Sequence, residues 1–211
     1  MQFHRPFATV TPTLDGEVLA VLATHDMSFT TGQVRRILTD YSEEGIRKVL
    51  TRLVLQGVVH AERIGNAFVY QLNTEHVAAQ PIKDLARLAN TFYTRVEQHL
   101  AAWQEPPTYG AVFGSAARGD MALASDIDVL LVRDDAADDA DWDRNLAEFA
   151  SKATAWSGND VRVIDYTVSG VRAAVDEPVL RDVLDYGLTV AGSRAWLLTT
   201  LRRPVRKGGD R

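Results

Sequence analysis

A glycine-serine pair followed at a fixed distance by two aspartates constrains the C-terminal half of this chain more than any other feature. Gly114-Ser115 ends the apolar stretch 109–113, and ten residues later Asp126-Ile127-Asp128 opens a second apolar stretch. Apolar segments separated by a glycine turn and a short helix are typical of an α/β unit. Because Asp126 and Asp128 are two apart, a strand places both carboxylates on one face.

The residues of this segment suit phosphate chemistry. Two carboxylates so close repel each other unless cations neutralise them, and Mg²⁺ takes one or two carboxylates while water and phosphate oxygens complete its shell. A Gly-Ser turn lets N–H groups and a hydroxyl approach phosphate oxygens, and the following helix adds a positive dipole end. Arg118 can neutralise phosphate or pair with Asp120, and both interpretations stay open. The sequence therefore predicts a magnesium site beside an anion cradle.

The motif from Gly114-Ser115 to Asp126-Ile127-Asp128 resembles that of the minimal nucleotidyltransferases of the polymerase β superfamily. The similarity covers roughly residues 109–193 and includes the Ala-Arg-Gly interior and the Ser-Asp-Ile-Asp ending. It implies a small mixed sheet with helices on one face, and a nucleoside triphosphate, with ATP the expected one, at Gly114, Ser115 and Arg118. It also implies Mg²⁺ at Asp126 and Asp128. A solvated strand edge is the alternative interpretation of Asp-x-Asp taken alone.

A third carboxylate, which in that family is a general base on a later strand, is not obvious here. Residues 161–166 predict that strand, and the resemblance puts Arg162 where related sequences have the acid. Asp165 is the catalytic candidate, yet three residues along a regular strand it faces away from Arg162. A different register, a bulge that turns Asp165 inward, or loss of the third acid would each account for this. An arginine there favours binding of nucleotide phosphates over deprotonation of an acceptor.

The N-terminal residues 1–75 predict a different unit, with three helices followed by a hairpin. Apolar residues recur at helical spacing over 14–25, Thr30 and Gln33 form a capping box for a second helix, and Ser42 caps a third. Two strand-like runs, 58–63 and 67–73, meet at Gly65-Asn66, residue types that suit a tight turn. This order predicts a winged helix-turn-helix domain.

Basic and polar residues occupy the side of the third helix away from its apolar stripe, and one arginine lies by the wing turn. The candidates for contact with DNA are Arg47, Lys48, Thr51, Arg52 and Arg63. They suit a helix in a major groove and a wing against the backbone. The segment 41–59 also resembles the recognition helix of bacterial winged-helix regulators of the MarR and ArsR kind, which implies double-stranded DNA as a partner. Protein contact is the alternative, because residues 1–75 hold seven Lys/Arg against eight Asp/Glu.

A polar linker and one long helix are predicted between the two units. Apolar residues at spacings of three and four run from Ile82 to about Trp103, before Pro106-Pro107. The predicted α+β organisation is a winged helix domain at 1–75, linker and connecting helix at 76–107, a nucleotidyltransferase domain with a mixed sheet at 108–195, and a basic tail at 196–211. The long helix can connect the domains or pair with its copy in a homodimer.

The composition restricts the compartment in which the protein is expected and the kinds of site that it can form. The chain has no cysteine, so disulfides and thiolate zinc sites are excluded. It contains no apolar run near the roughly 18 residues of a membrane span, and its start lacks the order of a signal peptide. A net charge of −5 argues against non-specific coating of nucleic acid. We expect a soluble, cytoplasmic protein without membrane contact.

Two functions follow from these patterns. The first is a DNA-binding, Mg²⁺-dependent nucleotidyltransferase that moves a nucleoside monophosphate from an NTP to a protein, RNA or small-molecule acceptor; stand-alone transferases of this kind resemble those of toxin–antitoxin and resistance systems. The second is a winged-helix transcriptional regulator whose degenerate transferase domain only senses a nucleotide. The presence or absence of the third acid separates the two.

Overall fold

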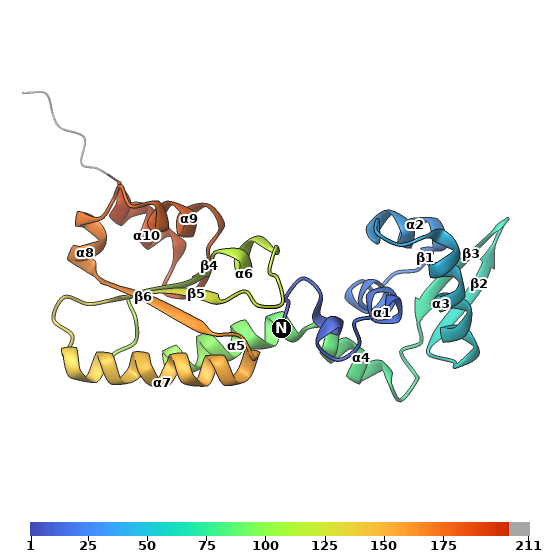
Figure 1. The fold of residues 1–211 in the computed structure, drawn as a ribbon, viewed down its shortest axis with the longest axis horizontal. Helices are drawn as coiled ribbons and strands as arrows, with labels where there is room; N and C mark the ends of the chain where they lie inside the picture. Colours follow the sequence, from blue (N-terminus) through green and yellow to red (C-terminus); the bar gives the residue numbers. More distant parts are fainter. Residues whose placement is uncertain (203–211) are drawn as a thin grey trace, which may run out of the picture. The chain divides into compact units, whose positions relative to one another are not determined.

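Apolar side chains gather into separate cores in two units of the chain. The computed structural model describes residues 1–202 (Figure 1). The first unit is Met1–Thr91 and the second begins at Phe92. The boundary therefore falls inside the segment 76–107 that the sequence assigns to a linker and connecting helix. Among residues 1–202, no helix combines the length and apolar character needed to cross a bilayer.

The first unit contains three helices, a three-stranded antiparallel sheet and a further helix. Its elements are η1 (Pro6–Thr9), α1 (Leu14–Thr24), β1 (Phe29–Thr30), α2 (Thr31–Ile37), α3 (Glu43–Leu55), β2 (Val59–Ile64), β3 (Ala67–Leu72) and α4 (Ala79–Ala86). The strand order is β1-β3-β2. The core lies between the helices and the sheet, and its fully buried side chains include Val18, Val34, Ile46 and Leu50.

Local signals in the sequence set the ends of these helices. The Thr30 hydroxyl accepts from the Gln33 N–H while the Gln33 side chain accepts from the Thr30 N–H, so the predicted capping box is confirmed. Ser42 caps α3 by accepting from the Gly45 N–H. The β2–β3 hairpin turns at Gly65, whose φ of +60° suits glycine. The predicted order of three helices and a hairpin is therefore present.

The second unit is built around a four-stranded mixed sheet of order β6-β5-β4-β7, with β5 and β6 parallel and the other pairs antiparallel. Its elements are α5 (Leu88–Ala101), which begins just before the boundary, β4 (Tyr109–Phe113), α6 (Ser115–Arg118), β5 (Ile127–Arg133), α7 (Asp139–Ser157), β6 (Val161–Thr167), α8 (Val168–Ala173), α9 (Pro178–Tyr186), β7 (Leu188–Ala191) and α10 (Arg194–Leu201). The predicted mixed sheet is confirmed.

Helices cover both faces of this sheet, whereas the family resemblance implied helices on one face (Figure 1). Helices α8, α9 and α10 pack on the face that carries Tyr109, Phe113 and Leu130, while α7 packs on the other. On that second face, Trp103 and Trp142 meet at 5.4 Å between ring centroids. Strand β5 is consequently apolar on both sides after Asp128, as a strand buried on two faces requires.

The predicted long helix is interrupted. Helix α4 ends at Ala86 and α5 begins at Leu88, with Arg87 between them in a non-helical conformation. Ile82 packs into the core of the first unit, whereas Phe92 and Val96 are buried in the second unit. One continuous apolar periodicity thus spans two helices that pack into different cores. Periodicity alone does not reveal the break between them.

The second unit extends beyond residue 195, where the sequence led us to expect a basic tail. Helix α10 reaches Leu201, is capped by the Ser193 hydroxyl, and buries Leu197 completely. The tail expectation is therefore wrong for 196–201. Arg203, Arg206, Lys207 and Arg211 lie outside the described residues.

Replacing Leu197 by alanine tests whether α10 belongs to this core. We expect Leu197→Ala to lower the free energy of unfolding by about 2–5 kcal/mol, because it removes a buried side chain and leaves a cavity. All four tryptophans lie at or after residue 103, so tryptophan fluorescence during urea denaturation reports the second unit alone. The exposed Thr199→Ala on the same helix should change the value by less than about 0.5 kcal/mol. Equal, small effects of both variants would contradict this packing.

Candidate functional site

The turn between β4 and α6 lies directly against one of the two aspartates. Gly114 has φ +68° and ψ −147°, a backbone conformation that is open essentially only to glycine. A Cβ atom built on Gly114 would lie 2.6 Å from Asp128 Oδ2. The backbone therefore approaches the Asp128 carboxylate more closely than any other residue type would allow. Ser115, half-buried, follows as the first residue of α6.

The two aspartates lie at the start of β5. Asp128 pairs with Phe113 of β4 on one side and with Arg162 of β6 on the other. Asp126 directly precedes the strand, and its Oδ2 lies 2.8 Å from Arg162 Nη1. Since Arg162 contacts Asp126 and is the strand neighbour of Asp128, the two carboxylates share one face, as the sequence predicts. Arg162 also lies near Asp160, with 3.5 Å between Nε and Oδ2.

The electrostatics of this pair favour a cation. Burial raises the pKa of Asp128, and the negative charge of Asp126 raises it further. The charges of Arg162 and Arg118 act in the opposite direction. Two carboxylates that are partly removed from water thus share a site at a cost that a bound cation would relieve.

Arg118 is held by an aspartate that the sequence analysis did not single out. Its Nη1 donates to both oxygens of Asp182 on α9, at 3.0 and 3.2 Å, and its Nε lies 3.7 Å from Asp120 Oδ2. The Gly114 N–H donates to Asp182 Oδ2 at 3.3 Å. Both alternatives for Arg118 therefore stay open, although its closer contacts are with Asp182. Asp182 is 68 positions from Gly114 in the sequence, and most acidic residues on a helix face water. The sequence around Asp182 therefore gives no indication that it belongs to the site.

Asp165 does not join this group. The β5–β6 register runs without irregularity and pairs Leu131 with Asp165, three positions from the pair of Asp128 and Arg162. Asp165 consequently lies on the opposite face of the sheet, where its Oδ2 accepts from Trp142 Nε1 of α7 at 3.2 Å. The expectation that Asp165 supplies the third acid is wrong in this structure, and no bulge turns it inward.

The donor set is compatible with Mg²⁺. No group of three or more His, Cys, Asp or Glu side chains within residues 1–202 is arranged to hold a metal ion. Asp126 and Asp128 would supply two hard oxygen donors, which is the number Mg²⁺ commonly takes from protein before water and phosphate complete its octahedron. Such an ion would depend on substrate phosphates for much of its coordination.

The candidate residues for DNA contact are exposed in the first unit, on α3 and the β2–β3 hairpin. Most of them already have acidic partners: Arg47 pairs with Glu43 and Glu44, Lys48 with Glu44, and Arg52 with Asp15. The Thr51 hydroxyl donates to the Arg47 carbonyl, and the Arg63 Nε donates to the Gly65 carbonyl. The outer face of α3 is therefore polar and partly neutralised rather than strongly basic.

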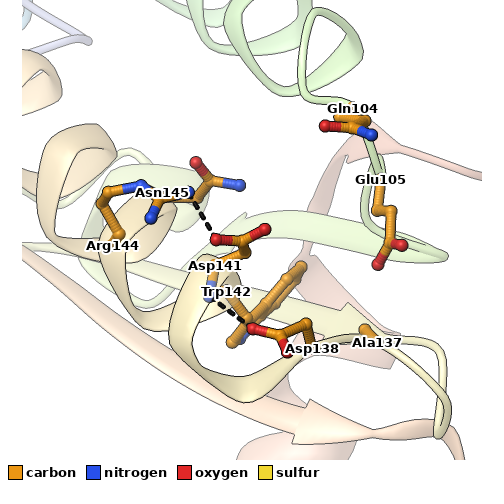
Figure 2. A pocket seen from close by; sticks show the side chains of 8 residues that line it. All are labelled: Gln104, Glu105, Ala137, Asp138, Asp141, Trp142, Arg144 and Asn145. Atoms are coloured by element: carbon orange, nitrogen blue, oxygen red, sulfur yellow. Dashed lines mark hydrogen bonds and ion pairs between the residues drawn. The ribbon is translucent and has the colours of Figure 1, made fainter.

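A separate small pocket of about 130 Å³ lies where α7 begins, beyond the end of β5 that is opposite to Asp126 (Figure 2). Gln104 and Glu105 line one side, and Asp138, Asp141 and Trp142 line the other. Arg144 pairs with Asp141, whose N–H donates to the Asp138 side chain. The pocket contains none of the residues that the sequence assigns to a functional site.

Comparison with known proteins supports the interpretation of the second unit. Residues 62–157 match the family described as "Putative nucleotidyltransferase DUF294". This segment contains the Gly114-Ser115 turn and the Asp126/Asp128 pair, and it ends before β6. No curated protein matches the sequence.

Three solved structures resemble the chain at low identity. A toxin–antitoxin with AMP-PNP is 20% identical, covers 52% of this chain and 80% of its own, and has a TM-score of 0.40. A toxin–antitoxin MntA–HpeT mutant is 16% identical, with 52% and 80% covered and a TM-score of 0.39. A tri-AMPylated Shewanella oneidensis HEPN toxin in complex with MNT antitoxin is 15% identical, with 54% and 80% covered and a TM-score of 0.36. On the family match and its motif, the second unit is nucleotidyltransferase-like.

Substitution of Gly114 with and without Asp128 separates the close approach of these two residues from backbone strain, and Gly119 provides a reference for an ordinary left-handed glycine. Gly119→Ala should cost about 1–2 kcal/mol, because Gly119 has φ +77° but open space around a Cβ. Gly114→Ala should cost at least about 1 kcal/mol more, since the φ and ψ of Gly114 are open essentially only to glycine and its Cβ also overlaps the Asp128 carboxylate. Urea denaturation followed by tryptophan fluorescence measures both. In an Asp128→Ala background the excess should shrink, and an unchanged excess would contradict the contact.

Proposed function

We propose that the second unit binds a nucleoside triphosphate with Mg²⁺, ATP being the expected nucleotide, and transfers the nucleotidyl group to an acceptor. One observation carries the proposal: the Gly114 turn lies against the carboxylate of Asp128 while Asp126 occupies the same face. A phosphate-sized anion at the turn would therefore be adjacent to the metal-binding pair. Cations at that junction would contact protein carboxylates and phosphate oxygens together.

Each residue of the site has a role in this proposal. Asp126 and Asp128 would hold Mg²⁺, which would neutralise the charge of the phosphates during transfer. The Ser115 hydroxyl and the N–H groups of the turn contact phosphate oxygens, and Gly114 permits their close approach. Arg118 supplies a further positive charge with its remaining N–H groups.

The residue opposite Asp128 on β6 limits the chemistry. A guanidinium carries N–H donors and no acceptor, so Arg162 cannot serve as a general base for the acceptor. Asp165 faces α7 and does not replace it. Transfer at this site thus depends on an acceptor that ionises readily, or on a base supplied by the acceptor molecule itself.

Labelled nucleotide tests transfer directly. Incubating the protein with Mg²⁺ and each α-³²P-labelled NTP, with cell lysate as the source of acceptors, should label a protein, RNA or small molecule. Asp126→Asn should reduce labelling by about 100-fold or more, because it removes a metal ligand and half of the charged pair. Asp143→Asn, on the exposed surface of α7, is the matched control and should label like the unmodified protein. Equal labelling by both variants would overturn the assignment.

A second candidate function is a nucleotide sensor without transfer activity, and the position of Arg162 favours it. A guanidinium beside the pair attracts phosphate and leaves the acceptor without a protein base. This candidate predicts Asp126-dependent binding of Mg·ATP with no labelled product from any lysate. The transfer proposal predicts Asp126-dependent binding of Mg·ATP and also a labelled product. Measuring binding and labelling together therefore decides between the two functions.

For the first unit we propose a winged helix-turn-helix domain that binds double-stranded DNA. The element order α1-β1-α2-α3-β2-β3, with its antiparallel sheet and exposed α3, supports this proposal. In such domains the helix lies in the major groove and the hairpin contacts the backbone. The basic side chains of α3 stay exposed although they pair with acidic neighbours, namely Arg47, Lys48 and Arg52. Because ion pairs at the surface are weak, these side chains can exchange their acidic partners for DNA phosphates.

The salt dependence of DNA binding tests this second proposal. Replacing both Arg47 and Arg52 by alanine should weaken binding and reduce the magnitude of the log–log salt slope by about two, because two phosphate contacts are lost. The matched control replaces Lys83 and Arg87 of the α4 region by alanine, which removes the same charge elsewhere in the unit. Fluorescence anisotropy with labelled duplex DNA measures both. Identical slopes for the two double variants would argue against α3 as the contact.

A further inference from the structure

Asp182 contacts two parts of the phosphate-binding segment at once, and neither the motif nor the family match assigns it a role. It accepts from the Gly114 N–H and from Arg118 Nη1, and its side chain is 29% exposed. One carboxylate thus joins the turn to the arginine that follows it by four positions. We infer that Asp182 is the positioning residue of the nucleotide site, which fixes the guanidinium of Arg118 and the Gly114 turn for phosphate. This inference rests on the proposed nucleotide binding.

The packing of α9 makes Asp182 the fixed member of this group. Leu180 and Val183, on either side of it, are buried in the core with Tyr109 and Phe113 of β4. The helix begins at Pro178 and ends at Tyr186, so Asp182 is near its centre and away from its frayed ends. Asp182 therefore projects from a rigid helix that is anchored to the same strand from which the turn emerges.

Arg118 is the member that needs positioning. Its side chain is 39% exposed and belongs to α6, a helix of four residues. Long arginine side chains lose considerable rotamer entropy when they bind a ligand, and an ion pair formed in advance reduces that loss. Nη1 makes both short contacts with Asp182 and Nε lies 3.7 Å from Asp120 Oδ2, which leaves Nη2 to donate to phosphate oxygens.

The same contacts permit the opposite effect, in which Asp182 competes with phosphate for Arg118 and for the Gly114 N–H. The two effects differ in sign. Positioning predicts weaker nucleotide binding after Asp182→Asn, whereas competition predicts tighter binding because a negative charge near the phosphates is removed. We commit to positioning because Asp182 is held by buried neighbours and Arg118 retains further donors.

The test measures Mg·ATP binding by calorimetry for full-length variants at fixed ionic strength. Asp182→Asn should raise the Kd by about 3- to 10-fold, the size expected for a partly exposed charge-assisted contact. Asp185→Asn, exposed one turn further along α9, removes the same charge and should leave the Kd within twofold. Arg118→Ala should also weaken binding. The double variant Arg118→Ala/Asp182→Asn should match Arg118→Ala within about twofold, because Asp182 acts mainly through Arg118.

Amide hydrogen exchange of residues 114–119 in the absence of nucleotide supplies a readout that does not depend on binding. Exchange should accelerate in Asp182→Asn but not in Asp185→Asn, because the turn loses its anchor. Unchanged exchange, an equal or lower Kd, or fully additive effects with Arg118→Ala would each overturn the role of Asp182. If the unmodified protein binds no Mg·ATP, the proposed function is overturned, and the nucleotide role of Asp182 with it. The exchange measurement would still show separately whether Asp182 anchors the turn.

Discussion

The backbone of Gly114 lies so close to the carboxylate of Asp128 that a Cβ atom at position 114 would be 2.6 Å from Asp128 Oδ2, and the whole candidate site depends on this approach. A positive φ at Gly114 bends the chain away from β4 at the point where β5 begins, so the turn and the aspartate pair become neighbours across two antiparallel strands. Any side chain at position 114 would push them apart. The spacing of ten residues between Ser115 and Asp126 is long enough for one turn of helix and a return loop, which places the two halves of the motif at the same end of adjacent strands.

Charge organises the surroundings of this close approach. Five carboxylates, those of Asp120, Asp126, Asp128, Asp160 and Asp182, lie near two arginines, Arg118 and Arg162. The protein alone therefore leaves the pair at β5 incompletely neutralised. Burial raises the pKa of Asp128, and the neighbouring charge of Asp126 raises it further. A divalent cation that binds together with a triphosphate would supply the positive charge that the two aspartates need.

Much of the fold could be predicted from local signals. The Thr30–Gln33 capping box, the Ser42 cap and the glycine turns mark the ends of elements through contacts between residues close in sequence, and alternation along β5 indicated which face carries the aspartates. Regular strand geometry also indicated that Asp165 faces away from Arg162, as it does. The break at Arg87 could not be predicted, because both flanking helices share one apolar rhythm. Asp182 was missed because only the packing of α9 on β4 brings it to the turn.

We propose that Asp126 and Asp128, without Asp165, hold a divalent ion together with a nucleotide. Electron paramagnetic resonance of Mn²⁺, titrated with protein and ATP, measures this most directly. Asp165→Asn should retain the ternary complex of the unmodified protein, whereas Asp128→Asn should lose it. A protein in which Asp165→Asn abolishes the complex and Asp128→Asn preserves it would contradict the account.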